Sequence, residues 1–270
     1  MIHEIIHLNQ YYPLPYDPIL EINLAYYEDG DFRKPTTGII IVPGGGYEFI
    51  ARREADSVAL KFMEKKYSTF ILYYSVKQAY PVPQKELLAA FDFVKHNCQK
   101  YSTLANKISL IGFSAGGHLV GSYSYLCQRK EFLDLLPHKE KNCCPNSIIL
   151  SYPVITMGKN TERQTHLNIT GGDSKLDDLL SIEKNITPTY PPTFYWATIT
   201  DNCVSIDNGY LLKKALDDNH VRNECLFYPF LDHGVSIGTD MVNKISPKDE
   251  ESYKEVAGWF EKAIEFIKCF

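Results

Sequence analysis

The sequence predicts an α/β protein with a mostly parallel central sheet, because short apolar runs alternate along the chain with segments of helical periodicity. The apolar runs are nearly continuous, which is typical of parallel strands covered by helices on both faces. The chain has 270 residues, 44% of them hydrophobic, and is therefore long enough to bury one sizeable core. We expect residues 1–270 to form a single domain.

Eight segments have the composition of strands. The first two are Ile2–Leu8 and Ile19–Tyr27, and side chains of different character alternate along the second one. The later ones are short runs rich in apolar residues: Gly38–Val42, Thr69–Tyr74, Ile108–Phe113, Ile148–Tyr152, Phe194–Ile199 and Glu224–Phe230. Helices are expected where apolar residues recur on one face, over Glu86–Cys98, over Ala115–Cys127 and over residues 253–267.

Composition and charge exclude several classes of partner. The formal net charge is −5, whereas a protein whose main partner is nucleic acid or an anionic membrane surface favours a basic face. No apolar run approaches the ~18 residues that a membrane span needs. The N-terminal stretch MIHEIIHLNQYYPL carries an acidic residue and has no basic start followed by a long apolar core, so no signal peptide is predicted.

Cysteine usage indicates a reducing compartment. The chain has seven cysteines, an odd number, and the adjacent pair Cys143-Cys144 suits neither a disulfide framework nor a zinc site. We expect reduced, mostly buried thiols in a cytoplasmic protein, with no metal and no cofactor.

One segment departs from the alternation of strands and helices. From Pro153 to Pro192 the chain is polar, with several Gly, Thr and Asn residues and one short helical piece around Leu176–Glu183. A connection of this length inside a compact domain usually has a functional role. Two interpretations stay open: a small cap or pocket-lining insertion at about residues 153–192, and a plain surface excursion.

The stretch Gly112–Gly116 reads GFSAG, the pattern G-x-S-x-G, between an expected buried strand and an expected helix. A serine in that position is forced into a sharp turn, and the flanking glycines leave room for close backbone packing. Short Gly/Ser strings also occur in ordinary turns, but here the strand–turn–helix context is present. The pattern predicts Ser114 as a nucleophile whose hydroxyl is raised out of the sheet.

A serine hydroxyl needs a general base, and the chain offers eight histidines. His233 follows the expected strand Glu224–Phe230 and precedes Gly234, which places it on a loop at a strand end. His118, four residues after Ser114, is expected to pack within its helix and not to point back at the hydroxyl. The others are expected to be surface or core residues: His3, His7, His96, His138, His166 and His220. His233 is therefore the predicted base.

Asp201 is the predicted acidic partner of that histidine. It comes shortly after the apolar run Phe194–Ile199, again at an expected strand end, where it would hold the imidazole tautomer that faces the serine. The alternative is a turn aspartate that caps a helix beginning near Ser205. Two rivals are less suitable, because one lies inside that helix and the other adjoins the base in sequence: Asp207 and Asp232.

A run of three glycines, in the sequence PGGGY at residues 43–47, directly follows the expected strand Gly38–Val42. Consecutive glycines allow backbone N–H groups to turn toward one point, where they can bind a developing oxyanion. The N–H groups of Gly45 and Gly46, together with that of Ala115, are the predicted donors. A phosphate-binding loop is the alternative, but the G-x-G-x-x-G spacing and the P-loop Gly-Lys-Ser/Thr are both missing.

Three aromatic residues, Tyr47, Tyr152 and Trp196, are candidates to line a substrate pocket. Aromatic residues make up 13% of the chain, so packing in the core is the alternative for each of them.

Several longer motifs extend over about residues 38–238: PGGGY (43–47), RREAD (52–56), YP (80–81), IGFSAGGHL (111–119), SIEKNITPTYPPTF (181–194), D-x-x-V (201–204) and DHG (232–234). With this combination the chain resembles the α/β-hydrolase acetylesterases, a group of acetyl xylan esterase-like and esterase/lipase proteins. The resemblance implies an eight-stranded α/β-hydrolase fold and hydrolysis of small acyl esters, often acetyl groups on sugars, without a metal. It matches position by position the residues predicted above: Ser114, Asp201 and His233 as the triad, and Gly45, Gly46 and Ala115 as oxyanion donors. In one departure, Ser205 stands where relatives commonly have proline.

The predicted function is hydrolysis of a small ester, with acetylated sugars among the implied substrates, by a serine carboxylesterase that acts as a monomer or homodimer. Neither nucleic acid nor a membrane is an expected partner. The first alternative is an amidase or arylformamidase that uses the same triad. The second, less favoured because all three triad residues are present, is a binding module without catalytic activity.

Overall fold

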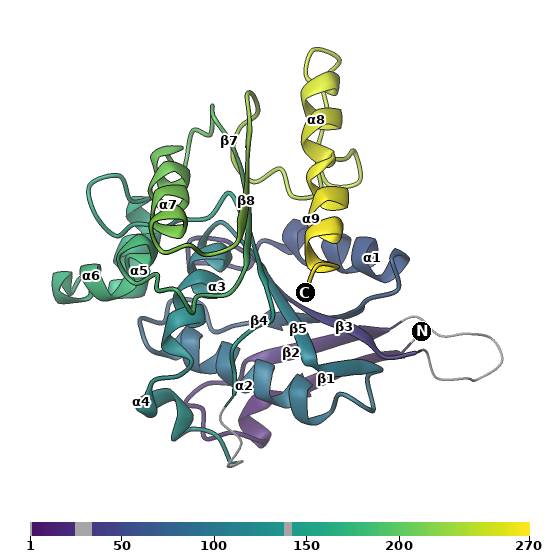
Figure 1. Cartoon of the computed structure of the whole chain (residues 1–270), viewed down its shortest axis with the longest axis vertical. Coiled ribbons are helices and arrows are strands. Elements are labelled where there is room, and N and C mark those ends of the chain that lie inside the picture. The colour runs from purple at the N-terminus through teal and green to yellow at the C-terminus, as the bar shows by residue number, and fades with distance from the viewer. Residues whose placement is uncertain (1, 25–33, 138–141) are drawn as a thin grey trace.

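The computed structural model describes residues 2–24, 34–137 and 142–270, and its centre is a sheet of eight strands (Figure 1). The strands are β1 (Ile2–His7), β2 (Ile19–Leu24), β3 (Thr36–Val42), β4 (Ser68–Tyr73), β5 (Thr103–Phe113), β6 (Ile148–Ser151), β7 (Thr193–Thr198) and β8 (Asn223–Tyr228). Their order is β1-β2-β4-β3-β5-β6-β7-β8. The pairs β1/β2 and β2/β4 are antiparallel and the other five are parallel, so the predicted mostly parallel sheet is confirmed.

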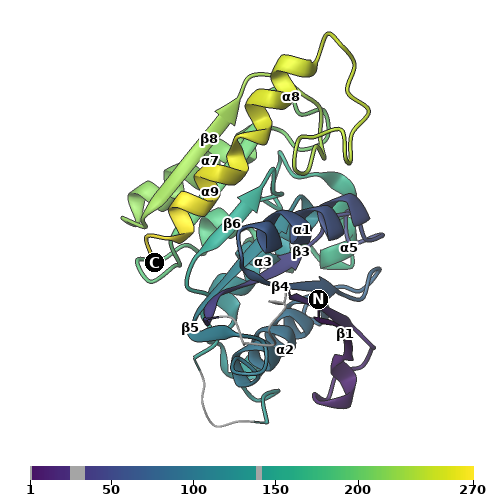
Figure 2. The same cartoon turned by 90° about the vertical axis from the view of Figure 1, so that its right-hand side faces the viewer.

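Helices cover both faces of this sheet. The α-helices are α1 (Asp56–Glu64), α2 (Val82–His96), α3 (Ala115–Leu126), α4 (Lys130–Leu133), α5 (Arg163–Thr170), α6 (Asp177–Leu180), α7 (Asp207–Asp218), α8 (Glu250–Ala257) and α9 (Trp259–Ile267). The 3-10 turns are η1 (Leu8–Gln10), η2 (Arg52–Glu54), η3 (Ser174–Leu176) and η4 (Ile182–Lys184). Figure 1 shows α7 on one side of β8 and α9 on the other, and Figure 2 looks onto the face that α1 and α9 cover. None of the helices in the described residues is long and apolar enough to cross a bilayer.

The carboxyl ends of the parallel strands meet at one edge of the sheet. The segment Ile108–Phe113 of β5 is buried and pairs with β3 on one side and β6 on the other. Because β3, β5, β6, β7 and β8 run in the same direction, the loops that leave them converge at this edge. These loops carry most of the chemically active side chains predicted from sequence.

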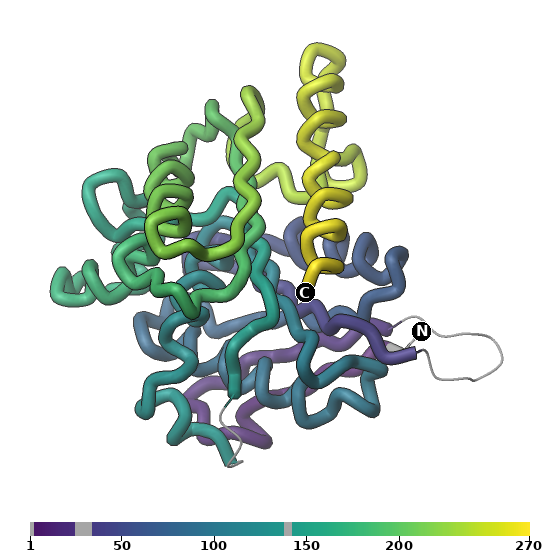
Figure 3. The backbone as a smooth tube through the Cα atoms, viewed as in Figure 1, coloured from purple at the N-terminus to yellow at the C-terminus, as the bar shows by residue number. Residues whose placement is uncertain are grey.

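The predicted element boundaries differ from the observed ones by a few residues at several ends. Strand β5 begins at Thr103, ahead of the predicted Ile108, and part of the predicted strand Ile19–Tyr27 falls outside the described residues. The C-terminal stretch is two helices, α8 and α9, and not one continuous helix. The N–H of Gly258 bonds to the carbonyl of Glu255 at 3.1 Å, three residues back, so the backbone tightens where the two helices join. Figure 3 shows α8 continuing beyond α9, at the opposite end of the molecule from the N-terminal strands.

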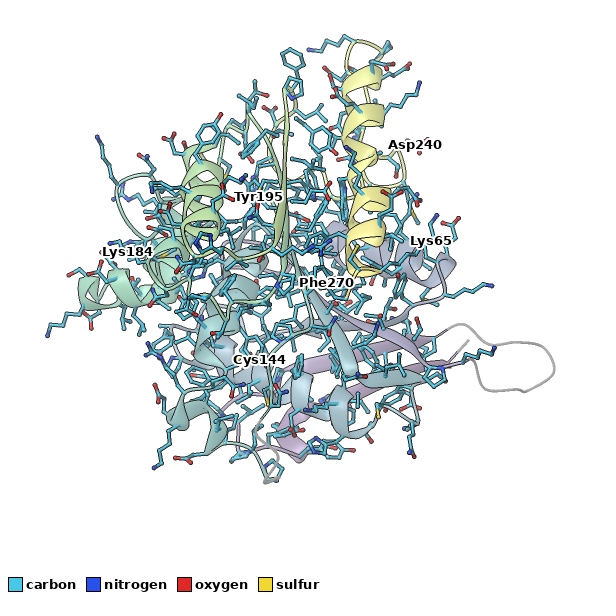
Figure 4. All side chains as sticks on the ribbon, viewed as in Figure 1. Lys65, Cys144, Lys184, Tyr195, Asp240 and Phe270 are labelled. Carbon is cyan, nitrogen blue, oxygen red and sulfur yellow. The ribbon has the colours of Figure 1, made fainter. Side chains whose placement is uncertain are left out.

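Aromatic residues fill the core on both faces of the sheet. Tyr195 of β7 is 1% exposed and lies between α7 and β8 (Figure 4). On the other face, Trp259 of α9 is completely buried and stacks on Trp196, with ring centroids 5.2 Å apart and an interplanar angle of 18°. The indole N–H of Trp259 also donates to the carbonyl oxygen of Ser236 at 3.0 Å. Trp259 therefore joins the C-terminal helix to β7 and to the loop after β8.

The cysteines correct one expectation. All seven are free thiols, but only Cys127 and Cys143 are buried. Three of them are exposed, namely Cys144, Cys203 and Cys269. The expectation of mostly buried thiols is therefore wrong.

Removing the Trp259 side chain should destabilise the whole fold. We expect Trp259→Ala to lower the free energy of unfolding by about 3–5 kcal/mol, since it deletes a large buried ring and leaves a buried carbonyl without its donor. Urea denaturation measures the change. It is followed by far-UV circular dichroism and not by fluorescence, because the variant lacks one tryptophan. Leu60→Ala, at a 49% exposed position of α1, is the control and should cost less than about 1 kcal/mol. Equal losses in the two variants would contradict this account of the core.

Candidate active site

Ser114 occupies a strained turn between β5 and α3. Its backbone has φ 51° and ψ −120°, a conformation that side chains rarely adopt. The turn is possible because no side chain intervenes: an added Cβ at Gly116 would lie 2.2 Å from the carbonyl oxygen of Val42, and one at Gly112 would lie 2.3 Å from that of Gly116. The N–H of Ser114 donates to the carbonyl of Ser151 at 3.0 Å, which ties the turn to the end of β6.

Ser114, His233 and Asp201 form one hydrogen-bonded line. The distance from Ser114 Oγ to His233 Nε2 is 2.8 Å, and that from His233 Nδ1 to Asp201 Oδ2 is 2.7 Å. His233 is 32 positions from Asp201 and 119 positions from Ser114 in the sequence, so the fold brings the three residues together. With Nδ1–H donating to the carboxylate, Nε2 carries the lone pair that faces the serine hydroxyl.

The carboxylate of Asp201 accepts hydrogen bonds from two backbone N–H groups as well as from the imidazole. Its Oδ1 accepts from the backbone N–H groups of Cys203 at 2.9 Å and Val204 at 2.8 Å. The Asp201 side chain is 1% exposed, and that of His233 is 16% exposed. These two N–H groups hold the carboxylate in place.

The glycine loop after β3 lies across the cavity from this line of residues. Gly45 and Gly46 have positive φ angles of 122° and 62° and share the cavity wall with Ser114. Ala115 is the first residue of α3, where backbone N–H groups have no partner inside the helix. Within the described part of the chain, no hydrogen bond to another residue occupies the N–H of Gly45 or Gly46.

A cavity of about 450 Å³ opens above Ser114. Its wall combines polar and apolar side chains and comes from the glycine loop, η2, the segment 153–192 and the loops after β5, β7 and β8. The residues on it are Gly45, Gly46, Glu48, Phe49, Ala51, Arg53, Glu54, Ser114, Glu162, Gln164, Thr165, Cys203 and His233. Three of these, Glu162, Gln164 and Thr165, belong to the segment 153–192 whose role the sequence left open.

The three aromatic candidates for the pocket are core residues. Tyr47, Tyr152 and Trp196 are at most 2% exposed, and none of them is among the residues that line the cavity. The Trp196 indole N–H donates to Ser151 Oγ at 2.9 Å, and the Tyr152 ring packs edge-on against the His233 ring at 5.0 Å. All three therefore pack in the core, which was the alternative predicted for them. Tyr152 also packs against the imidazole of His233.

His118 is buried and bonded away from the serine, as expected. Its ring bridges the Tyr47 hydroxyl, 2.9 Å from Nδ1, and the carbonyl oxygen of Leu180, 2.8 Å from Nε2. A carbonyl only accepts, so Nε2 carries the hydrogen, Nδ1 is the acceptor and Tyr47 donates to it. Burial lowers the pKa of His118 to about 4, so the imidazole is neutral in the folded protein near neutral pH.

The remaining candidates lie away from the cavity. Asp207 begins α7 and accepts from Asn160 at 2.9 Å. The other described histidines lie elsewhere on the surface, and four of them face carboxylates: His3 with Glu21, His7 with Asp17, His96 with Asp92 and His166 with Asp177. His138 is outside the described residues.

Glu54 is a buried feature of the site that was not predicted. Its side chain borders the cavity but the residue is only 1% exposed. One carboxylate oxygen accepts from the N–H of Gly44 at 2.8 Å, and the other accepts from the Tyr152 hydroxyl at 2.9 Å. The sequence signal was the motif RREAD, which contains Glu54 but does not by itself assign the residue a role.

The sequence pattern of the BD-FAE family matches residues 24–216, most of the chain. The chain belongs to the BD-FAE family. This membership, together with the fold, confirms the resemblance to α/β-hydrolase esterases that was predicted from the motifs.

Two curated relatives and one solved structure are similar over most of this BD-FAE chain. An endo-1,4-β-xylanase B from Butyrivibrio fibrisolvens is 28% identical over 228 residues, 80% of this chain and 35% of that protein. An acetylxylan esterase from Xylanibacter ruminicola is 28% identical over 221 residues, 74% of this chain and 41% of that protein. The chain thus spans less than half the length of either relative. The structure of an acetyl ester-xyloside bifunctional hydrolase from Caldicellulosiruptor lactoaceticus is 29% identical, with a TM-score of 0.79 and 97% of each chain covered.

The burial of His118 should make stability depend on pH. The unfolded imidazole takes up a proton near pH 6.5 and the folded one near pH 4, so the unfolded state binds more protons between these values and stability falls as pH is lowered. From pH 7 to pH 5 we expect this group to lower the free energy of unfolding by about 2 kcal/mol. Urea denaturation at both pH values of the wild type and of His118→Gln, which cannot titrate, isolates the effect.

The fall should be smaller in His118→Gln by about that amount. His220→Gln, at an exposed position of the chain, is the control and should behave like the wild type. An equal fall in wild type and His118→Gln would contradict the burial of a neutral imidazole.

Proposed function

We propose that this BD-FAE chain is a serine carboxylesterase that hydrolyses small acyl esters through Ser114, His233 and Asp201. The hydrogen-bonded line from Ser114 Oγ through the imidazole to the Asp201 carboxylate is the observation that carries the proposal. The names of the relatives support a carboxylic ester hydrolase, since one is an acetylxylan esterase and another an acetyl ester-xyloside hydrolase.

The proposed reaction has two steps. His233 Nε2 accepts the proton as Ser114 Oγ attacks the ester carbonyl, and the Asp201 carboxylate stabilises the imidazolium that forms. The N–H groups of Gly45, Gly46 and Ala115 bind the oxyanion of the tetrahedral intermediate. The imidazolium then gives its proton to the leaving alcohol, and water hydrolyses the acyl-enzyme with His233 again acting as base.

The substrate we propose is an acetyl ester of a polyhydroxylated alcohol such as a sugar. The cavity wall around Ser114 carries Glu48, Arg53, Glu162 and Gln164, whose side chains suit hydroxyl groups better than a long hydrocarbon chain. The segment 153–192 acts as a pocket-lining insertion in this proposal, since three of its residues lie on the wall.

The whole chain works as one domain, and its unpaired thiols support the cytoplasm as its location.

Replacing the nucleophile tests the function directly. Ser114→Ala should abolish hydrolysis of p-nitrophenyl esters while the wild type hydrolyses acetate faster than the longer esters up to octanoate, because the residue supplies the attacking oxygen. Initial rates across the ester series measure this, and a fluorophosphonate probe should label the wild type only. Ser174→Ala, at an exposed position of η3, is the control and should keep full activity.

Retained turnover in Ser114→Ala would overturn the proposal. A folded wild type that leaves every ester intact but cleaves an N-formyl anilide would show the same triad acting on amides. A wild type that neither hydrolyses a substrate nor reacts with the probe would point to a binding module.

The role of the acid separates Asp201 from its sequence rival. Asp201→Asn should lower kcat/KM for p-nitrophenyl acetate by about 10³- to 10⁴-fold, because the amide no longer holds the imidazole tautomer that accepts the serine proton. Steady-state kinetics measure the loss. Asp207→Asn, on the exposed start of α7, is the matched control and should stay within twofold of the wild type. A larger loss in Asp207→Asn than in Asp201→Asn would reverse the assignment.

A further inference from the structure

A second buried carboxylate, Glu54, lies beside the proposed triad. It is 1% exposed, and none of the ion pairs among the described residues includes it. A buried carboxylate is costly unless hydrogen bonds compensate it. Glu54 lines the same cavity as Ser114 and His233, so we ask which interactions at the site it serves.

The hydrogen bonds of Glu54 can stabilise its ionised form. The Tyr152 hydroxyl oxygen accepts from the N–H of Ser236 at 3.0 Å, so its own proton is free to go to Glu54 Oε1. Glu54 Oε2 accepts from the N–H of Gly44. Two donors that point at its two oxygens fit the ionised form of Glu54. Burial raises the pKa of Glu54, and the bonds from Gly44 and Tyr152 oppose that rise.

These bonds join three loops that surround Ser114. Gly44 comes directly before the glycines proposed to bind the oxyanion, so its N–H bond to Glu54 sets the course of that loop. Tyr152 follows β6, and its ring rests on the His233 ring at a centroid distance of 5.0 Å. Ser236 is on the same loop as His233. One carboxylate therefore positions the oxyanion loop and the base together.

Titratable and charged groups from several elements surround the Glu54 carboxylate. The titratable and charged groups around it are Tyr74 after β4, Tyr152 after β6, His233 after β8 and Arg53 on η2. Those around the imidazole on the cavity side are Asp201, Ser114, Cys203, Glu162 and Arg53. The Arg53 guanidinium lies against the backbone of Gly234, where an added Cβ would be 2.2 Å from its Nη2. Arg53 balances part of the negative charge at the exposed rim, whereas Glu54 is below it in the low-dielectric interior.

We propose that Glu54 is a positioning residue for the esterase reaction, which holds the glycine loop and the Tyr152 ring around Ser114 and stabilises the protonated imidazole of His233 by its charge. This inference rests on the proposed function, because it needs His233 to become an imidazolium during catalysis. Asp201 stabilises that cation from one side, and Glu54 adds a second negative charge from another.

Glu54→Gln tests the proposal, because the amide is of the same size but carries no charge. We expect kcat for p-nitrophenyl acetate to fall by about 10- to 100-fold with KM within twofold, as for a misplaced reacting group. The acid limb of the kcat/KM profile should also move down by about half a pH unit or more, since loss of a nearby negative charge destabilises the protonated imidazole. A purely structural role would leave that limb in place.

Two further variants control the experiment. Glu86→Gln removes another buried carboxylate, one that accepts from the N–H of Ser75 and lies outside the cavity wall, and should change neither kcat nor the acid limb. Glu54→Asp keeps the charge but is too short to reach both Gly44 and Tyr152, so it should lower kcat and leave the acid limb at its wild-type position. Should Glu54→Gln fail to fold, Glu54→Asp alone decides the positioning role.

An unchanged kcat in Glu54→Gln, a loss of kcat without movement of its acid limb, or a wild-type kcat in Glu54→Asp would overturn the inference. Labelling with a fluorophosphonate separates this failure from failure of the proposed function. A wild type that is labelled at Ser114 and hydrolyses esters keeps the function whatever Glu54 does, whereas an unlabelled, inactive wild type removes the basis of both.

Discussion

At the carboxyl end of β5 the backbones of β3, β5 and α3 pack so closely that no side chain fits between them. Gly112 and Gly116 are in contact there, and Gly116 also meets the end of β3 at Val42. This crowding forces Ser114 into its positive φ and turns the hydroxyl toward the loops at the sheet edge. The junction also adjoins the glycine loop at Pro43 and the end of β6 at Ser151, whose carbonyl accepts from the Ser114 N–H.

Electrostatic balance is the second requirement of the site. Asp201 is nearly inaccessible to water, yet two backbone N–H groups and the imidazole satisfy its oxygens. Glu54 is satisfied by one N–H and one hydroxyl. His118 is kept neutral by burial, so it adds no charge to the helix that begins at Ser114. The interior around the serine therefore holds two carboxyl groups with hydrogen-bonded oxygens and one imidazole able to become positive, which suits a reaction that passes through an imidazolium.

Much of the fold and the outline of the site could be predicted from sequence, because each signal is local. Buried parallel strands are continuous apolar runs, and Ser114, Asp201 and His233 each follow such a run, so the common strand direction brings them to one edge. The position of the aromatic residues could not be predicted, since a ring such as Trp196 within a buried strand packs on a face that sequence does not define. Glu54 was missed because its polar neighbours suggest a surface segment. Its burial depends on Tyr152, 98 positions away.

The hydrogen-bonded link from Tyr47 through His118 to the carbonyl of Leu180 has a consequence for engineering this scaffold. The segment 153–192, which supplies part of the cavity wall, is attached by this link to the helix of the nucleophile and to the loop of the oxyanion glycines. The whole segment therefore cannot be exchanged between homologues without regard to this link. A donor segment has to present a backbone carbonyl at the place of residue 180, or the graft will leave a buried imidazole N–H unsatisfied and disturb the glycine loop from beneath.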